Sequence, residues 1–119
     1  MDNIKKMAVE LGEKVYQSDL YQSYLYYKKR VENKPNLKQK IDELKKLQLT
    51  QGLRRRQGEF VALQEEENLS KAYSEVALDP DGMGFWESEK QLMSFVADIL
   101  EIVVTQAPID FSYTDNMEN

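Results

Sequence analysis

Residues 84–106, with the sequence GFWESEKQLMSFVADILEIVVTQ, decide the fold of this chain. Apolar residues recur three, four or seven positions apart within the stretch, at Phe85, Leu92, Val96, Ile99 and Val103. This spacing is typical of a helix that buries one seam against its neighbours. The seam is widened on its flanks by Met93, Phe95, Leu100 and Ile102. We therefore expect this helix to contact at least two other helices.

Two shorter helices are predicted at the start of the chain. An apolar stripe that includes Ile4 and Leu11 predicts a first helix that ends near Gln17. Ser18 then provides a cap for a second helix, which runs to about Asn33. The two helices are expected to be nearly continuous.

The middle of the chain predicts a third and a fourth helix. Pro35 suits the first turn of a helix, so the third helix begins there. Glycines at positions 52 and 58 weaken a helix, which predicts a bend or hairpin between them. The fourth helix is expected from Glu59 to a tight turn at residues 79–82, where Pro and Gly stand together.

The composition supports an all-α fold. The chain has 119 residues, of which 41% are hydrophobic and 31% charged, with only five Gly and three Pro. A chain of this length fits one domain, and this composition favours helices over strands. We predict four or five antiparallel helices in a long helical hairpin or bundle. Residues 1–106 are expected to form one helical domain, and residues 107–119 a largely disordered tail.

The residue types that are absent restrict the chemistry. The sequence contains neither Cys nor His, which excludes thiolate catalysis, cysteine-ligated metals and a histidine base. We therefore predict no catalytic residue, no metal site and no cofactor, and we do not expect an enzyme or a small-molecule substrate. No run approaches the ~20 apolar residues of a membrane span, and the N-terminus lacks a signal peptide, so we expect a cytoplasmic protein.

The charges are unevenly divided along the chain. Residues 1–58 carry 14 Lys and Arg against 7 Asp and Glu, while residues 59–119 carry 2 against 14. The net charges of the two halves are thus +7 and −12, and we expect basic helices to lie against acidic ones. Glu89 falls on the apolar side of its helix, so it is predicted to pair with a Lys or Arg of the first half.

Two basic clusters leave open a role in RNA binding. The first cluster follows several tyrosines, and the second lies between the two glycines; their members are Lys28, Lys29, Arg30, Arg54, Arg55 and Arg56. Such residues can contact phosphates. A solvated or ion-paired surface is the plainer interpretation, so an RNA-associated module remains the alternative hypothesis.

The order and spacing of several motifs carry a resemblance to a known family. The matching residues are Ala8 and Leu11, Ser18 ahead of Tyr24, Pro35 followed by Leu37, Ile41, Leu44, Leu47 and Gln48, then Asp79 and Pro80, Phe85, Trp86, Glu87, Ser88 and Glu89, and finally Leu92, Ile99 and Ile102. Over roughly residues 2 to 106, the chain resembles the YlbF/YmcA family of small bacterial helical regulators.

The resemblance implies a hairpin-like helical fold and a regulatory role exerted through self-association or pairing with paralogues. Members of the family are linked to competence, sporulation, biofilm development and RNA processing. Some bind iron-sulfur clusters through cysteines that this chain lacks. We therefore expect a cytoplasmic regulator or adaptor that acts by protein–protein interaction, with a second copy, a paralogue or ribonuclease-associated proteins as partners. The predicted dimer interface comprises Phe85, Trp86, Leu92, Phe95, Val96, Ile99 and Val103.

Overall fold

The computed structural model describes residues 2–110 and 112. Within that part of the chain, five helices and no strand are present, so the predicted all-α fold is confirmed. The helices are α1 (Asp2–Gln17), α2 (Asp19–Glu32), α3 (Pro35–Arg56), α4 (Leu63–Ala77) and α5 (Pro80–Gln106). The predicted tail begins after α5, and residues 111 and 113–119 of that tail lie outside the described residues.

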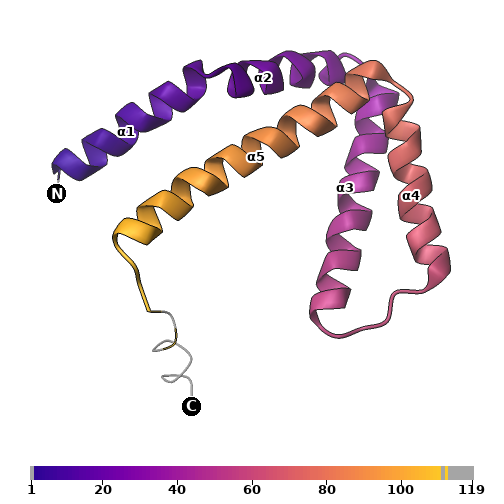
Figure 1. Ribbon diagram of the computed structural model, residues 1–119. Helices are drawn as coiled ribbons and strands as arrows, with labels where there is room; N and C mark the ends of the chain where they lie inside the picture. Colours follow the sequence, from indigo (N-terminus) through magenta and orange to yellow (C-terminus); the bar gives the residue numbers. More distant parts are fainter. Residues whose placement is uncertain (1, 111, 113–119) are drawn as a thin grey trace.

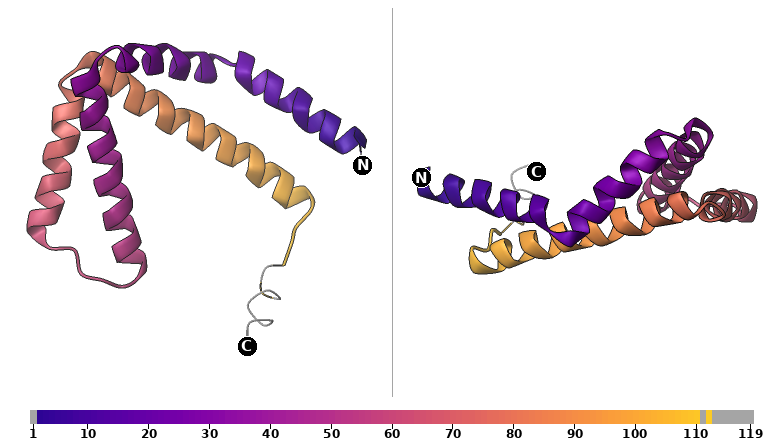
Figure 2. Two further views of the ribbon diagram at one scale, coloured as in Figure 1. Left: turned by 180° about the vertical axis from the view of Figure 1, so that it is seen from behind. Right: turned by 90° about the horizontal axis from the view of Figure 1, so that it is seen from above.

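The five helices form an open, angular structure (Figure 1). Helices α1 and α2 follow one another almost in line, and α5 runs back beneath them in the opposite direction. Helices α3 and α4 form an antiparallel hairpin that leaves the other helices at a steep angle. Figure 2 shows the same arrangement from behind and from above, with α1 and the end of α5 both directed away from the hairpin.

Capping residues explain where two of the helices begin. The Ser18 hydroxyl accepts a hydrogen bond from the Tyr21 backbone N–H at 3.3 Å, which starts α2 at the predicted place. Asp79 caps α5 in the same way, since its carboxylate accepts from the Asp81 N–H at 2.8 Å. The predicted turn at residues 79–82 was therefore wrong. Pro80 occupies the first helical turn of α5, where its missing N–H costs nothing.

The end of the α3–α4 hairpin also differs from the prediction. Helix α3 continues through Gly52 to Arg56, and α4 begins at Leu63 instead of Glu59. The reason is a tertiary contact: the buried Gln51 side chain donates from Nε2 to the Glu65 carbonyl at 2.8 Å, which ties the end of α3 to the start of α4. The chain turns instead at Gly58, whose φ of 78° suits glycine.

The hydrophobic core lies where four helices meet. It consists of Val31 from α2, Leu37, Ile41 and Leu44 from α3, Val76 from α4 and Phe85 from α5. Leu44 and Val76 are almost fully buried, and Tyr24, Tyr27 and Trp86 pack against the cluster with part of their surface. Beyond Leu92, α5 contains no fully buried residue. This main cluster therefore lies at one corner of the molecule, while Val61 in the loop between α3 and α4 is buried separately.

Two glycines at the start of α5 allow this corner to close. A Cβ at Gly82 would lie 2.5 Å from the Val76 carbonyl oxygen and 2.9 Å from Leu37 Cδ1. A Cβ at Gly84 would overlap the ring of Tyr27. Helices α2, α3 and α4 can therefore approach α5 this closely only because both positions lack a side chain.

The molecule exposes far more surface than a compact monomer of its size. Its radius of gyration is 18.7 Å, whereas a compact chain of 119 residues has about 13.5 Å. Its accessible surface is 9645 Å², against about 6,700 Å² for a typical monomer of 13.9 kDa. Helix α1 contributes to this excess because it contains no buried residue.

We predict that Gly82→Ala destabilises the fold by about 1–3 kcal/mol, because the added methyl group overlaps the Val76 backbone, which cannot rotate away. The matched control is Gly52→Ala, since a Cβ at Gly52 meets no atom within 4 Å and alanine favours a helix by up to ~1 kcal/mol. Urea unfolding monitored by circular dichroism measures both. Equal unfolding midpoints for the two variants would contradict the packing argument.

Candidate interaction surface

Helix α1 and residues 93–106 of α5 form a projecting unit that we call the arm. Both segments point away from the core and lie on the same side of the molecule (Figures 1 and 2). Many large apolar side chains of the arm are exposed, namely Ile4, Met7, Val9 and Leu11 in α1 and Met93, Val96, Leu100, Ile102, Val103 and Val104 in α5. Exposed apolar surface of this extent is unusual for a monomeric protein, which makes the arm the candidate interaction surface.

An apolar groove separates the two helices of the arm. One wall consists of Ala8, Leu11, Gly12, Val15 and Tyr16 of α1 together with Tyr21 of α2, and the other of Val96, Ile99 and Leu100. The groove has a volume of about 360 Å³. Tyr16 and Tyr21 lie against each other where α1 meets α2, with ring centroids 5.2 Å apart. The lining contains no charged residue, so an apolar side chain is the natural occupant.

The structure divides the predicted dimer interface into two parts. Phe85 and Leu92 are buried inside the chain, and Trp86 packs against the core and lies edge-on to Tyr73. The assignment of Phe85 and Leu92 to a dimer surface was wrong, because both side chains are buried within the single chain. Trp86 is only partly buried, so its part in an interface stays a prediction. The remaining members lie on the arm: Phe95 and Ile99 are partly buried, while Val96 and Val103 are 38% and 55% exposed.

Sequence reasoning missed the contribution of α1 to this surface. Ile4 and Leu11 belong to the apolar stripe that predicts the first helix, but the predicted interface contains no residue of that helix. In the structure Ile4 and Leu11 are 73% and 42% exposed. The spacing of apolar residues gives the face of a helix that is to be covered, but not which molecule covers it.

The predicted basic patch is not one surface. Lys28, Lys29 and Arg30 lie near the end of α2, close to the start of α3, whereas residues 54–56 end α3. A helix of 22 residues separates the two clusters by about 30 Å. Several of these bases also have carboxylate partners within the chain: Lys28 pairs with Glu32 at 4.0 Å and Arg30 with Asp81 at 2.6 Å.

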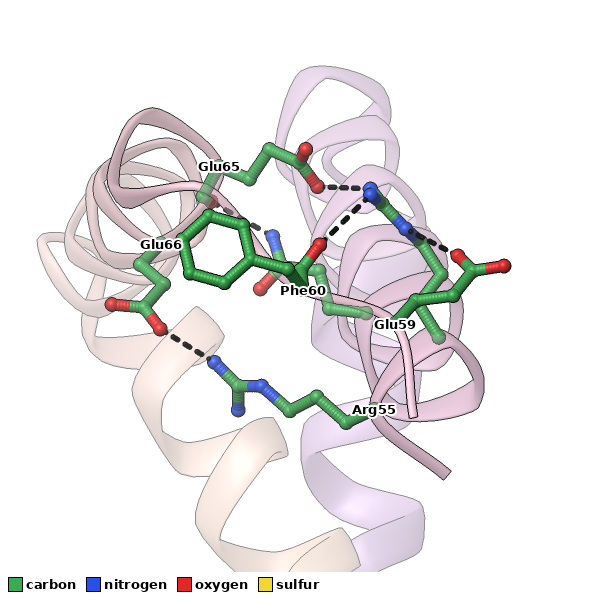
Figure 3. A network of polar contacts seen from close by, with 7 residues as sticks. Arg55, Glu59, Phe60, Glu65 and Glu66 are labelled. Carbon is green, nitrogen blue, oxygen red and sulfur yellow. Dashed lines mark hydrogen bonds and ion pairs between the residues drawn. The ribbon is translucent and has the colours of Figure 1, made fainter. Parts of the chain in front are cut away.

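Two of the three adjacent arginines fix the hairpin loop instead. Arg54 donates to the Glu59 carboxylate at 3.1 Å, to the Phe60 carbonyl at 3.2 Å and to the Glu65 carboxylate. Arg55 reaches across to Glu66 at 2.9 Å (Figure 3). These contacts satisfy the first two guanidinium groups within the hairpin.

A second polar network joins the start of α5 to the loop between α2 and α3. Asp81 is only 10% exposed at its side chain and contacts both Arg30 and Lys34, the latter at 2.8 Å. Lys34 also contacts Asp79 at 3.1 Å. Hydrogen bonds from Lys34 and Arg30 lower the pKa of Asp81. The pKa of Asp79 is lowered mainly by the hydrogen bond that it accepts from the Asp81 backbone N–H, and to a lesser extent by the one from Lys34. The same bonds to Asp81 raise the pKa of Lys34 and Arg30.

The predicted attraction between the two halves of the chain is confirmed. Seven of the nine ion pairs in the described part of the chain join a base of residues 1–58 to an acid of residues 59–119. One of them is the pair predicted for Glu89, which Lys45 contacts at 2.7 Å. Lys45 also lies over the ring of Phe85, so this pair borders the core.

Two further properties of the described residues concern metals and membranes. No group of three or more acidic side chains among residues 2–110 and 112 is arranged to hold a metal ion. Over the same residues, none of the helices combines the length and apolar character needed to cross a lipid bilayer.

The fold and its surface define a class: a small all-helical protein with a tight core at one corner and an uncovered apolar arm. Comparison with known proteins agrees with this class. The chain belongs to the family described as "Control of competence regulator ComK, YlbF/YmcA", whose model matches residues 4–106. The resemblance noted in the sequence is thereby confirmed.

Two relatives carry the name UPF0342 protein. The one from Caldicellulosiruptor saccharolyticus is 30% identical over 103 residues, which cover 87% of this chain and 86% of the relative. The one from Caldicellulosiruptor bescii is 29% identical over 103 residues, which cover 87% of each. No solved structure matches the chain.

The network around Asp81 makes the fold sensitive to acid. The pKa values of Asp79 and Asp81 lie below the ordinary value of 3.8 in the folded chain, so protonation favours the unfolded state. Their contribution to stability is present above pH 3.8 and is lost as the pH falls through the lowered pKa values. We predict that the urea midpoint of Asp81→Asn falls less between about pH 6 and about pH 2.5 than that of the original chain.

The matched control is Asp42→Asn, because the Asp42 side chain is 62% exposed and its one ion pair among the described residues is with Lys38 on its own helix. This variant is expected to follow the pH dependence of the original chain. If Asp81→Asn did the same, the stabilising role of the network would be contradicted.

Proposed function

We propose that this protein is a non-enzymatic regulator or adaptor that acts by binding other protein chains through the arm, and that it forms a homodimer or pairs with a paralogue. The observation that carries the proposal is the apolar surface of α1 and distal α5, which the chain itself leaves uncovered. The regulatory part is supported by membership of a family described by its control of a competence regulator.

The amount of exposed surface fits a lasting protein interface. The accessible surface exceeds that of a typical monomer by about 3,000 Å². Permanent homodimer interfaces bury roughly 2,000–5,000 Å² in total, or about 1,000–2,500 Å² per chain, and are more apolar than transient ones. A second chain covering the groove and the adjoining apolar residues would therefore remove a large part of this excess.

The RNA alternative receives less support from the structure. The two basic clusters lie at opposite ends of α3, and Arg30, Arg54 and Arg55 have carboxylate partners within the chain. Ribonuclease-associated proteins fit the regulatory proposal as partners, because they would be contacted as proteins through the arm.

The proposal predicts that two charges placed in the groove separate the dimer. In Val96→Glu/Leu100→Glu, two carboxylates would lie in an apolar interface, so we expect the dissociation constant to rise by about 100-fold or more. Light scattering coupled to size-exclusion chromatography should report a dimer for the original chain and a monomer for this variant. Circular dichroism should show unchanged helix content, since both positions are outside the core.

The control variant is Phe60→Glu/Leu78→Glu. These side chains are 83% and 84% exposed and lie on the hairpin, so the same two charges are added away from the arm. We expect this variant to remain a dimer. A monomeric original chain at about 100 µM, or equal dissociation of both variants, would refute the proposed interface.

A further inference from the structure

Helix α3 carries apolar residues on two opposite sides. Its inner side, with Leu37, Ile41 and Leu44, is buried in the core. At 100° per residue, Leu49 and Leu53 lie about 140° and 180° around the helix from Leu44. They are 64% and 45% exposed. A solvent-facing side of a helix is normally polar, so an exposed pair of leucines one turn apart indicates that this side is covered by something else.

Two basic residues flank the leucine pair on the same side of the helix. The positions form one stripe with spacings of three, four and three residues, which we call the α3 outer stripe: Lys46, Leu49, Leu53 and Arg56. From residue 44 to residue 58 the chain contains five bases and no acid. The surface is therefore apolar along its centre and positive at both ends.

The other bases of this segment already have partners. Lys45 contacts Glu89, Arg54 contacts Glu59 and Glu65, and Arg55 contacts Glu66. Lys46 and Arg56, by contrast, take part in none of the ion pairs found among the described residues. The two bases on the outer stripe are thus the ones that remain available to carboxylates of another molecule.

The hairpin holds this stripe in a fixed position. Gln51 and Arg54 tie the last turns of α3 to α4 and to the loop, so the helix does not end at Gly52. Figure 3 shows Arg55 in contact with Glu66 and the loop with Phe60 that joins the two helices. A partner would therefore meet a preformed helical face, which lowers the entropic cost of binding.

From these observations we propose that the α3 outer stripe is a docking site for an amphipathic helix of another protein, with apolar residues one turn apart and a carboxylate on either side of them. The leucines insert between the apolar residues of the partner helix, and Lys46 and Arg56 pair with its carboxylates. This mode of recognition uses a helix as a ridge against a complementary helix. The site is separate from the arm and does not depend on how the arm is covered.

Nucleic acid is the competing occupant, and the leucines argue against it. A phosphate backbone would use Lys46 and Arg56 but would leave Leu49 and Leu53 in water. A protein helix accounts for both the bases and the apolar pair. The two occupants therefore differ in whether binding needs the leucines.

The test uses a helix-forming peptide of about 18 residues, roughly 27 Å long, with two leucines four positions apart and a glutamate three positions outside each of them. A second peptide carries lysine in place of both glutamates. Binding of each labelled peptide to the full chain is measured by fluorescence anisotropy at low and high salt. We expect the glutamate peptide to bind at least tenfold more tightly than the lysine peptide, and more weakly at high salt.

Variants of the stripe locate the site. Leu49→Ser/Leu53→Ser should weaken binding of the glutamate peptide at least tenfold, whereas Leu78→Ser, a change at a leucine that is 84% exposed elsewhere on the hairpin, should not. Lys46→Glu/Arg56→Glu should reverse the preference, so that the lysine peptide binds better. The control Lys29→Glu/Lys71→Glu changes the net charge equally at two exposed positions outside the stripe and should keep the original preference.

Several outcomes would overturn this proposal. They are an absence of peptide binding, equal binding of both peptides, or equal losses in Leu49→Ser/Leu53→Ser and Leu78→Ser. Salt-dependent binding of a single-stranded RNA oligonucleotide that needs the bases but not the leucines would assign the stripe to nucleic acid. A change in oligomeric mass in Lys46→Glu/Arg56→Glu would instead assign it to a second copy. Because the arm variants are measured separately, failure here leaves the arm proposal unaffected.

Discussion

The close approach of α5 to α2, α3 and α4 at its first two turns is the contact on which the rest of the structure depends. Gly82 and Gly84 leave room for Val76, Leu37 and the ring of Tyr27, and Asp81, directly before Gly82, accepts hydrogen bonds from Arg30 and Lys34. Steric and electrostatic requirements therefore coincide within the four residues 81–84. The glycines permit the distance between the helices, and the ion pairs select the orientation in which they meet.

The position of the core at this corner sets the directions in which α1, the end of α5 and the α3–α4 hairpin project. Because the core ends near Leu92, the remaining turns of α5 project beyond it, and α1 continues from α2 in the same direction. The hairpin leaves the corner at a steep angle to them. A protein of this length that placed its core centrally would cover both sides of its helices. Here the core occupies one corner, so the arm and the outer side of α3 stay exposed.

The sequence predicted the helices well wherever the signal was local. Ser18 and Pro35 marked helix starts. The basic first half and the acidic second half predicted that Glu89 pairs with a base of the first half, and that base is Lys45. It failed where a tertiary contact opposed a local preference. Glycine at position 52 weakens a helix by up to ~1 kcal/mol, but the hydrogen bond from Gln51 to the Glu65 carbonyl and the contacts of Arg54 hold the following turn in place. The acceptors of these hydrogen bonds belong to Glu65 in α4, so the spacing of residues around Gly52 does not predict the contacts.

For the candidate surfaces, the sequence predicted which residues are apolar but not which of them are exposed. Periodicity identified the apolar stripe of α5 but could not distinguish Phe85, which is buried against Tyr24 of α2, from Val103, which is 55% exposed. On α3, the register of Leu37, Ile41 and Leu44 does not include Leu49 and Leu53, which fall on the side opposite Leu44. Among the described residues, α2, α4 and α5 pack against the inner side of α3, and the two leucines of its outer side stay exposed. The arm and the outer stripe differ in chemistry, since one is an apolar groove and the other an apolar ridge with basic ends. In the proposed regulator, these two surfaces of different character bind two different molecules at once, because they do not overlap.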